Sequence, residues 1–353
     1  MTKLSKLRSK FDSLSIDAFL VTNPFNRRYM TGFTGTAGIA LITKEEALFI
    51  TDFRYTEQAN EEAKGFKVIE HSSPILEELG QYIKELNIES LAFEKSDVTY
   101  GLYESFKQHF ACDLKPTSQV IETLRIVKTP EEIAILKDAA KIADDAYEHI
   151  LNYIKPGVKE IDVANELEFF MRKQGASSSS FDIIVASGHR SALPHGVASH
   201  KEIQAGELVT LDYGALYNGY ISDITRTVAV GDVSEQLKEI YDVVLEAQIR
   251  GVEGIKPGMT GIEADALTRD YITEKDYGQY FGHSTGHGIG LEVHEGPGLS
   301  SRSDIVLEKN MVVTVEPGIY IAEVGGCRIE DDIYLTDSGN ERLTFATKEF
   351  IQL

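Results

Sequence analysis

The sequence predicts an α+β protein of two domains, a smaller α/β domain over residues 1–123 and a larger one over residues 124–353. Three observations support this. The chain is longer than one typical domain. Strand-like and helix-like segments alternate through its first part, which is typical of α/β folds. The second part contains a duplicated pattern of helices, turns and acidic strands, which indicates an internal repeat.

The first domain is expected to interleave helices with short β-rich strands bounded by Gly, Asn, Pro or charged turns. Helices are expected at about residues 3–15, 54–63, 75–86 and 99–110. Strands are expected at residues 18–22, 38–43, 46–51, 66–71 and 89–94. Residues 113–119, DLKPTSQ, are rich in turn formers and are expected to interrupt this pattern before the second domain.

The second domain opens with a strong helix start, because Thr129 can cap the helix, Pro130 fits its first position and Glu132 can complete a capping box. Residues 154–157 (IKPG) recur as residues 255–258, and each copy follows a long helical pattern and precedes another. Acidic strands then follow in each half with similar spacing. Pro-Gly turns are common, so the recurrence alone could be chance; the agreement in order favours an internal pseudo-twofold repeat.

Charge and cysteine content narrow the class of protein. A net charge of −21 argues against nucleic-acid binding, which needs a basic surface. No apolar run reaches the ~18 residues of a membrane span, and the N-terminus lacks the apolar segment of a signal peptide. Cys112 and Cys327 lie far apart and form no redox or metal motif. These features predict a cytoplasmic protein that binds neither nucleic acid nor membrane.

The first acidic pair is Asp212 in LDYG and Asp223 in SDITRT. Asn218-Gly219 between them indicates a hairpin turn, so the two carboxylates are expected on paired strands, facing each other. An acid in an apolar strand is costly to bury unless it is paired or binds a metal. Taken alone, each Asp could equally lie on a solvated strand face.

A glycine-rich stretch, HSTGHGIGLEVHEGP, contains His283, His287 and His294. Its glycines exclude the HExxH helix of zinc proteases and let the backbone approach a ligand closely. Residues 289–293 are expected to form a strand. A single histidine is more often structural than functional, but three of the chain's nine in this short stretch favour a functional site.

The second acidic pair is Glu316, which ends an apolar strand before Pro317-Gly318, and Glu330, which is expected on the returning strand. Arg328 is expected on the same strand face as Glu330, whereas Asp331 and Asp332 are expected at the surface or in a turn. Four carboxylates and one imidazole suit hard or borderline divalent cations. If Asp212, Asp223, His287, Glu316 and Glu330 converge, they could hold two ions with a hydroxide between them, as in a hydrolase.

These motifs, with SALPHG at residues 191–196, resemble the pita-bread metallopeptidase family, and the resemblance covers the whole second domain. NPFNRRYMTGF and TDFRY in the first domain, and the linker LRIVKTPEEI, resemble the creatinase-like domain of its proline-specific branch, which contains Xaa-Pro dipeptidase (prolidase) and aminopeptidase P. The resemblance implies a C-terminal pita-bread (creatinase/aminopeptidase) fold with an internal pseudo-twofold repeat, preceded by a creatinase-like N-terminal domain.

The resemblance also implies a role for each site residue. Asp212 would chelate one ion, Asp223 and Glu330 would bridge both, and His287 and Glu316 would complete the shell of the second ion. His195, His283 and His294 would hold substrate and transfer protons, assisted by Arg328, with Glu316 as the base. Phe181 is expected to form a wall for the proline ring.

The expected activity is metal-dependent hydrolysis of the Xaa-Pro bond of dipeptides by a hydroxide that bridges two ions. Aminopeptidase P activity on longer peptides is the alternative, and a catalytically inactive binding module is a remote one. The ions are expected to be Mn²⁺, with Co²⁺ or Zn²⁺ also compatible with these ligands. The branch resemblance further implies a homodimer and a small peptide with proline in second position as substrate. Charge and the lack of a long apolar run, as above, predict no nucleic-acid or membrane partner.

Overall fold

The computed structural model describes residues 1–353 and divides into two compact units, Met1–Arg125 and Ile126–Leu353. The predicted boundary after residue 123 falls inside the short helix α7 (Glu122–Arg125), which belongs to the first unit. No helix is both long enough and apolar enough to cross a membrane.

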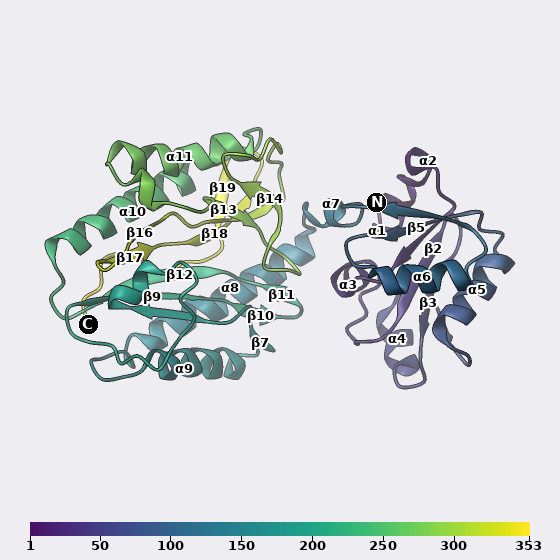
Figure 1. Ribbon diagram of the computed structural model, residues 1–353, viewed down its shortest axis with the longest axis horizontal. Coiled ribbons are helices and arrows are strands. Elements are labelled where there is room, and N and C mark those ends of the chain that lie inside the picture. Colours follow the sequence, from purple (N-terminus) through teal and green to yellow (C-terminus); the bar gives the residue numbers. More distant parts are fainter. The chain divides into compact units, whose positions relative to one another are not determined.

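The first unit is a mixed sheet flanked by helices (Figure 1). Its strand order is β4-β3-β2-β1-β5-β6, and strand β1 at its centre is buried along its whole length. The strands are β1 (Ala18–Val21), β2 (Ile39–Thr43), β3 (Ala47–Thr51), β4 (Lys67–Glu70), β5 (Ser90–Glu94) and β6 (Asp113–Thr117). The helices before α7 are α1 (Lys3–Arg8), α2 (Phe11–Leu14), α3 (Pro24–Thr31), α4 (Thr56–Glu62), α5 (Ile75–Glu85) and α6 (Tyr100–His109).

This unit differs from the prediction in its helices and in one strand. The helix predicted at residues 3–15 is divided into α1 and α2, and α7 was not predicted. The turn-rich residues 113–119 contain strand β6, which pairs in parallel with β5. Pro116 is tolerated there because β6 lies at the sheet edge, where a missing N–H need not break the ladder. Helix α3 was not predicted, although Asn23 caps it by accepting hydrogen bonds from the backbone of Phe25 and Asn26, and Pro24 occupies its first turn.

The second unit contains two helix pairs with strands between them (Figure 1). Helices α8 (Pro130–Ile150) and α9 (Glu160–Lys173) form the first pair, and α10 (Glu235–Gly254) and α11 (Gly261–Glu274) form the second. The predicted start of α8 is confirmed, because Thr129 and Glu132 form both bonds of the capping box. Thr260 and Glu263 form a capping box at α11.

Two sheets carry the strands of the two halves. The first has the order β12-β9-β8 and the second the order β14-β13-β15-β18-β19. These strands are β8 (Ile184–Ser187), β9 (Glu207–Tyr213), β12 (Ile224–Val230), β13 (Gly286–Gly288), β14 (Glu295–Leu299), β15 (Val312–Val315), β18 (Asp331–Leu335) and β19 (Asn340–Arg342). An antiparallel bridge between Thr225 and Glu330 joins the halves where the acidic motifs end.

Smaller strands complete each half. β7 (Ser178–Ser179), β10 (Ala215–Tyr217) and β11 (Tyr220–Ile221) form one small sheet, and β16 (Gly318–Ile321) pairs with β17 (Gly325–Arg328). The predicted hairpin turn is confirmed: Asn218 (φ 48°) and Gly219 (φ 82°) are both left-handed and connect β10 to β11. Each half therefore contains a helix, a turn, a second helix and then a hairpin flanked by acidic residues, as the pita-bread prediction requires.

Candidate metal centre

All five predicted metal ligands line one cavity of about 590 Å³ in the second unit. The ligand atoms of Asp223, His287 and Glu330 lie within 4.8 Å of one another. His287 Nε2 is 3.3 Å from Glu316 Oε1 and 3.9 Å from Asp223 Oδ2. The structure thus brings together residues from both halves of the repeat.

The four predicted acidic ligands lie at or next to the ends of strands, and this brings their side chains to the cavity. Asp212 lies in β9, opposite Thr225 of β12, and Asp223 directly precedes β12. In the second half Glu316 directly follows β15, and Glu330 directly precedes β18, where its N–H donates to Thr225 O at 3.0 Å. Each half therefore contributes two acids from the ends of neighbouring strands, and the bridge between the halves brings the two pairs together.

Burial sets the electrostatics of these carboxylates. It raises the pKa of Asp223 and of Glu330 well above their ordinary values, and repulsion from neighbouring carboxylates adds to the rise. Burial also acts to raise the pKa of Glu316, but the hydrogen bond and charge of His287 outweigh it, so this pKa lies below its ordinary value. Such a concentration of buried acids needs positive charge to be stable in ionised form.

The carboxylates also have unsatisfied oxygens that fit a cation. Asp212 Oδ1, Asp223 Oδ1 and Glu330 Oε1 are buried and accept no hydrogen bond. The other oxygen of Glu330 accepts a hydrogen bond from Thr225 Oγ1 at 2.6 Å, and that of Asp212 accepts one from Arg328. Since buried polar atoms are nearly always paired, these free carboxylate oxygens beside an imidazole fit a site for divalent metal ions.

The three predicted non-ligand histidines also border the cavity. The His294 ring lies 4.4 Å from that of His287, centroid to centroid. Burial lowers the pKa of His294, and the nearby charge of His287 adds to this. His283 Nδ1 is 4.0 Å from Glu316 Oε2, whereas His195 is exposed at the cavity mouth.

Arg328 is only 3% exposed, and its guanidinium group donates hydrogen bonds to four acceptors. It donates to Asp212 Oδ2, to Thr225 Oγ1 at 3.1 Å, to Pro194 O at 3.2 Å and to the Tyr320 hydroxyl at 2.7 Å. Tyr320, which lies 2.9 Å from His283 Nε2, was not singled out from the sequence, where only its position beside VEPG could have indicated it. Arg328 therefore orients Asp212.

The predictions that Asp331 and Asp332 lie at the surface or in a turn are wrong. Their exposures are 0% and 1%. Asp332 Oδ2 accepts the backbone N–H of Asp223 at 2.9 Å, so it holds the backbone of a predicted metal ligand. Acids near strand ends are usually solvated, but here Asp331 is paired with Arg226 and with Lys348 of the C-terminal segment.

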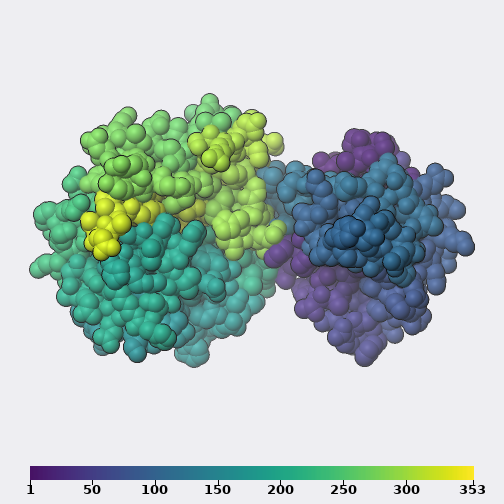
Figure 2. All heavy atoms as spheres, viewed as in Figure 1, coloured from purple at the N-terminus to yellow at the C-terminus, as the bar shows by residue number.

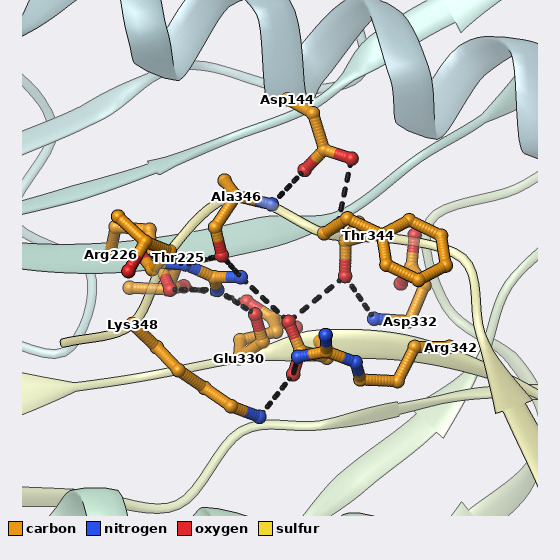
Figure 3. Close-up of polar contacts among 12 residues, drawn as sticks. Asp144, Thr225, Arg226, Glu330, Asp332, Arg342, Thr344, Ala346 and Lys348 are labelled. Carbon is orange, nitrogen blue, oxygen red and sulfur yellow. Dashed lines mark hydrogen bonds and ion pairs between the residues drawn. The ribbon is translucent and has the colours of Figure 1, made fainter.

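A network of polar contacts surrounds buried Arg226 (Figure 3). Asp331 belongs to this network through its ion pair with Arg226. One oxygen of Asp331 accepts from Arg226 Nη2 at 2.7 Å, and the other accepts from Lys348 Nζ at 2.6 Å. Arg226 also donates to the carbonyl of Glu330 and, at 2.7 Å, to that of Ala346. The C-terminal residues reach the surface in the space-filling view (yellow in Figure 2). Through Arg226 the network ties them to the backbone of Glu330, a predicted metal ligand.

Asp331→Asn is expected to lower the free energy of unfolding by ~3–5 kcal/mol, because removing one partner leaves buried Arg226 with an uncompensated charge. Urea unfolding of the metal-free protein would measure this loss. Asp337→Asn is the matched control: Asp337 forms a surface ion pair with Lys309 and its side chain is 83% exposed, so a change of at most ~1 kcal/mol is expected. Equal stability of the two variants would contradict this account.

Comparison with known proteins agrees with this geometry. Residues 134–337 match the metallopeptidase family M24, and residues 3–127 match the creatinase/prolidase N-terminal domain. A Xaa-Pro dipeptidase of Pyrococcus furiosus is 44% identical over 99% of this chain and 99% of its own length.

Solved structures show the same relationship. A structure described as Xaa-Pro dipeptidase from Bacillus anthracis has a TM-score of 0.99 at 63% identity and covers 99% of both chains. X-Pro aminopeptidase from Thermotoga maritima has a TM-score of 0.92 at 41% identity, over 98% of this chain and 100% of that one. The chain thus belongs to the M24 metallopeptidases, in the proline-specific branch that carries a creatinase/prolidase N-terminal domain.

Proposed function

We propose that this metallopeptidase hydrolyses the Xaa-Pro bond of dipeptides. The observation that carries the proposal is the cavity in which buried, unpaired carboxylate oxygens face His287. The relatives named Xaa-Pro dipeptidase, which match this chain over nearly its whole length, support the choice of substrate.

Two divalent ions, most simply Mn²⁺, would be held by the five residues that converge in this cavity. Asp212 would bind one ion, Asp223 and Glu330 would be shared by both, and His287 and Glu316 would bind the other. When bound, such a pair lowers the pKa of a water molecule and polarises the scissile carbonyl. The carboxylate-rich donor set is equally compatible with Co²⁺ or Zn²⁺.

The remaining groups would bind substrate and move protons. Glu316 would accept the proton of the attacking water on its carboxylate and pass it to the proline nitrogen as the C–N bond breaks. His294, beside His287 at the cavity wall, would donate a hydrogen bond to the carbonyl oxygen as negative charge develops there. His283 and Tyr320 would hold the orientation of Glu316 and Arg328.

Proline selectivity would come from the apolar side of the cavity. Phe181, Ile184 and Val197 line it together with Pro194 and Val293. A Xaa-Pro amide has no N–H, so a site shaped for the ring loses nothing by offering no acceptor there. Phe181 keeps its expected role as one wall of this subsite.

A dipeptide ends in a carboxylate directly after proline, and this negative charge needs a cation. Arg328 was expected to supply it, but its contacts with Asp212, Thr225 and Tyr320 already engage it. We therefore assign this carboxylate to His195, an exposed histidine that lines the cavity.

A peptide series tests this assignment. Amidating the C-terminus of Xaa-Pro is expected to lower kcat/KM by ~1.5–3 kcal/mol, the size of a charged hydrogen bond, which is ~10- to 100-fold. The measurement compares Xaa-Pro, Xaa-Pro-amide and Xaa-Pro-Xaa peptides on the metal-loaded enzyme. Equal or faster cleavage of Xaa-Pro-Xaa would identify the chain as an aminopeptidase P.

The aminopeptidase alternative has one specific observation in its favour. No Lys, and no Arg other than the engaged Arg328, lines the cavity, so no free side chain of fixed positive charge meets a C-terminal carboxylate. The 41% identity to an X-Pro aminopeptidase over the whole chain is consistent with it. The peptide series separates the two activities directly.

Assembly and location complete the proposal. We expect a homodimer, which the proline-specific branch implies and which light scattering after size-exclusion chromatography would measure. A cytoplasmic location is supported by Cys112 and Cys327, which are both free thiols.

A further inference from the structure

The position of His294 depends on a loop that carries no regular structure. Residues 289–293 were expected to form a strand, but β13 ends at Gly288 and β14 begins at Glu295, so His294 stands at the end of a bent loop. No hydrogen bond holds the His294 side chain, and its ring packs against the ring of His287. Whatever fixes the loop backbone therefore fixes His294.

The side chain that follows His294 closes this loop. Glu295 Oε1 accepts the backbone N–H of Leu291 at 2.8 Å and that of Glu292 at 3.1 Å. These bonds join the residue after His294 to the backbone before it, so the loop is held on both sides of the histidine. The same bonds keep the loop from adopting the extended form that its sequence predicts.

Lys128 holds the carboxylate of Glu295 in place. Its Nζ donates to Glu295 Oε2 at 2.9 Å, and the two side chains are only 1% and 5% exposed. The Lys128 backbone is itself fixed, because its N–H donates to Asn310 O at 2.8 Å and the next residue caps helix α8. The cation is therefore anchored on a rigid element.

The loop passes very close to this ion pair. A Cβ atom at Gly290 would lie 2.8 Å from one Glu295 carboxylate oxygen and 2.9 Å from Lys128 Nζ, so only glycine fits without displacement. The Gly290 carbonyl accepts the N–H of Ile221 at 2.9 Å, which fixes the start of the loop. Buried ion pairs contribute little net stability, so a pair packed this tightly is better explained by the geometry that it imposes.

We infer that Lys128 and Glu295 are positioning residues that hold the His294 loop against the metal centre. Neither residue touches the reacting atoms, and they act through the backbone of residues 290–294. The inference rests on the proposed catalytic role of His294, so its test includes a measurement that needs no substrate.

The kinetic test is a double-mutant cycle between Lys128→Met and His294→Ala. In the otherwise wild-type enzyme, Lys128→Met is expected to lower kcat ~10- to 100-fold with little change in KM, because small misplacements of catalytic groups cost up to ~10²-fold. In the His294→Ala background the same change should cost less than ~2-fold, because the group that it positions is gone. Lys141→Met, which removes an exposed ion pair with Asp145, is the control and should leave kcat unchanged in both backgrounds.

The measurement without substrate is the imidazole ¹H–¹⁵N spectrum of the metal-free protein. The His294 resonance is assigned by its absence in His294→Ala, and Lys128→Met should shift or broaden it while the His195 resonance stays in place. If Lys128→Met does not fold, Lys128→Met/Glu295→Gln replaces the buried pair by a neutral one and is expected to give the same two results. A protein without Xaa-Pro activity would still give this spectrum, so failure of the proposed function is distinguishable.

Two results would overturn the inference. One is an equal loss of kcat from Lys128→Met in both backgrounds, which would mean that the pair acts through another group. The other is an unchanged His294 resonance in a folded Lys128→Met protein, which would mean that the loop keeps its shape without the ion pair.

Discussion

Replacing Asp223 by alanine is expected to lower kcat/KM on a Xaa-Pro dipeptide by ~10³-fold or more. Metal ions contribute several kcal/mol of charge stabilisation to such transition states, and each 1.36 kcal/mol is tenfold in rate. A carboxylate oxygen of Asp223 lies within 4.8 Å of ligand atoms of His287 and Glu330, and Asp223 Oδ1 is buried without a hydrogen-bond partner. The substitution would therefore remove the ligand that we propose both ions share. Elemental analysis after reconstitution should give roughly two ions per wild-type chain and fewer in the variant.

Asp337→Ala is the control for this experiment, because the Asp337 side chain is exposed and does not line the cavity. It should keep both its metal content and its activity. Full activity of the wild-type enzyme in excess chelator, or of Asp223→Ala without added metal, would show that the converged carboxylates do not form the reaction centre.

Replacing His294 by alanine is expected to lower kcat by ~10²–10⁴-fold while metal content stays near that of the wild type. The His294 ring packs 4.4 Å from His287 but lies outside the group of carboxylates with unpaired oxygens, so it is placed to act on the substrate. Steady-state kinetics and elemental analysis of the same preparation separate the two effects.

The opposite pattern in His294→Ala would show that His294 is a metal ligand. In that case the variant would lose its ions and would regain normal turnover when they are supplied in excess. Asp223→Ala provides the reference for true ligand loss in the same assay.

Local signals in the sequence predicted most elements of the fold. The capping box of Thr129 and Glu132 and the Asn218-Gly219 turn are short-range features, and both form as expected. Strand β6 was missed because its proline and turn formers are acceptable only at a sheet edge, and edge position is a property of the assembled sheet.

In the site, too, local sequence features were predictable and tertiary arrangement was not. Asp212, Asp223, His287, Glu316 and Glu330 could be recognised because each occupies an unusual local setting, an acid at the end of an apolar strand or a histidine among glycines. Sequence patterns alone left open whether they converge, and the bridge between Thr225 and Glu330 supplies that convergence.

The supporting groups could not be predicted from local pattern. Asp331 is buried only because Arg226 and Lys348, which are distant in sequence, meet it there. Lys128 reaches Glu295 across most of the second unit's sequence, and this contact is also why residues 289–293 bend instead of forming a strand. Such pairs depend on tertiary contacts, which outweigh local preference.

The most direct test of metal-dependent Xaa-Pro hydrolysis is a titration of metal-depleted enzyme with Mn²⁺ while release of proline from a Xaa-Pro dipeptide is followed. We expect no release before metal is added and a rate that rises until roughly two ions are bound per chain. A rate that is already maximal in the depleted enzyme, or no release of proline at any metal loading, would contradict this expectation.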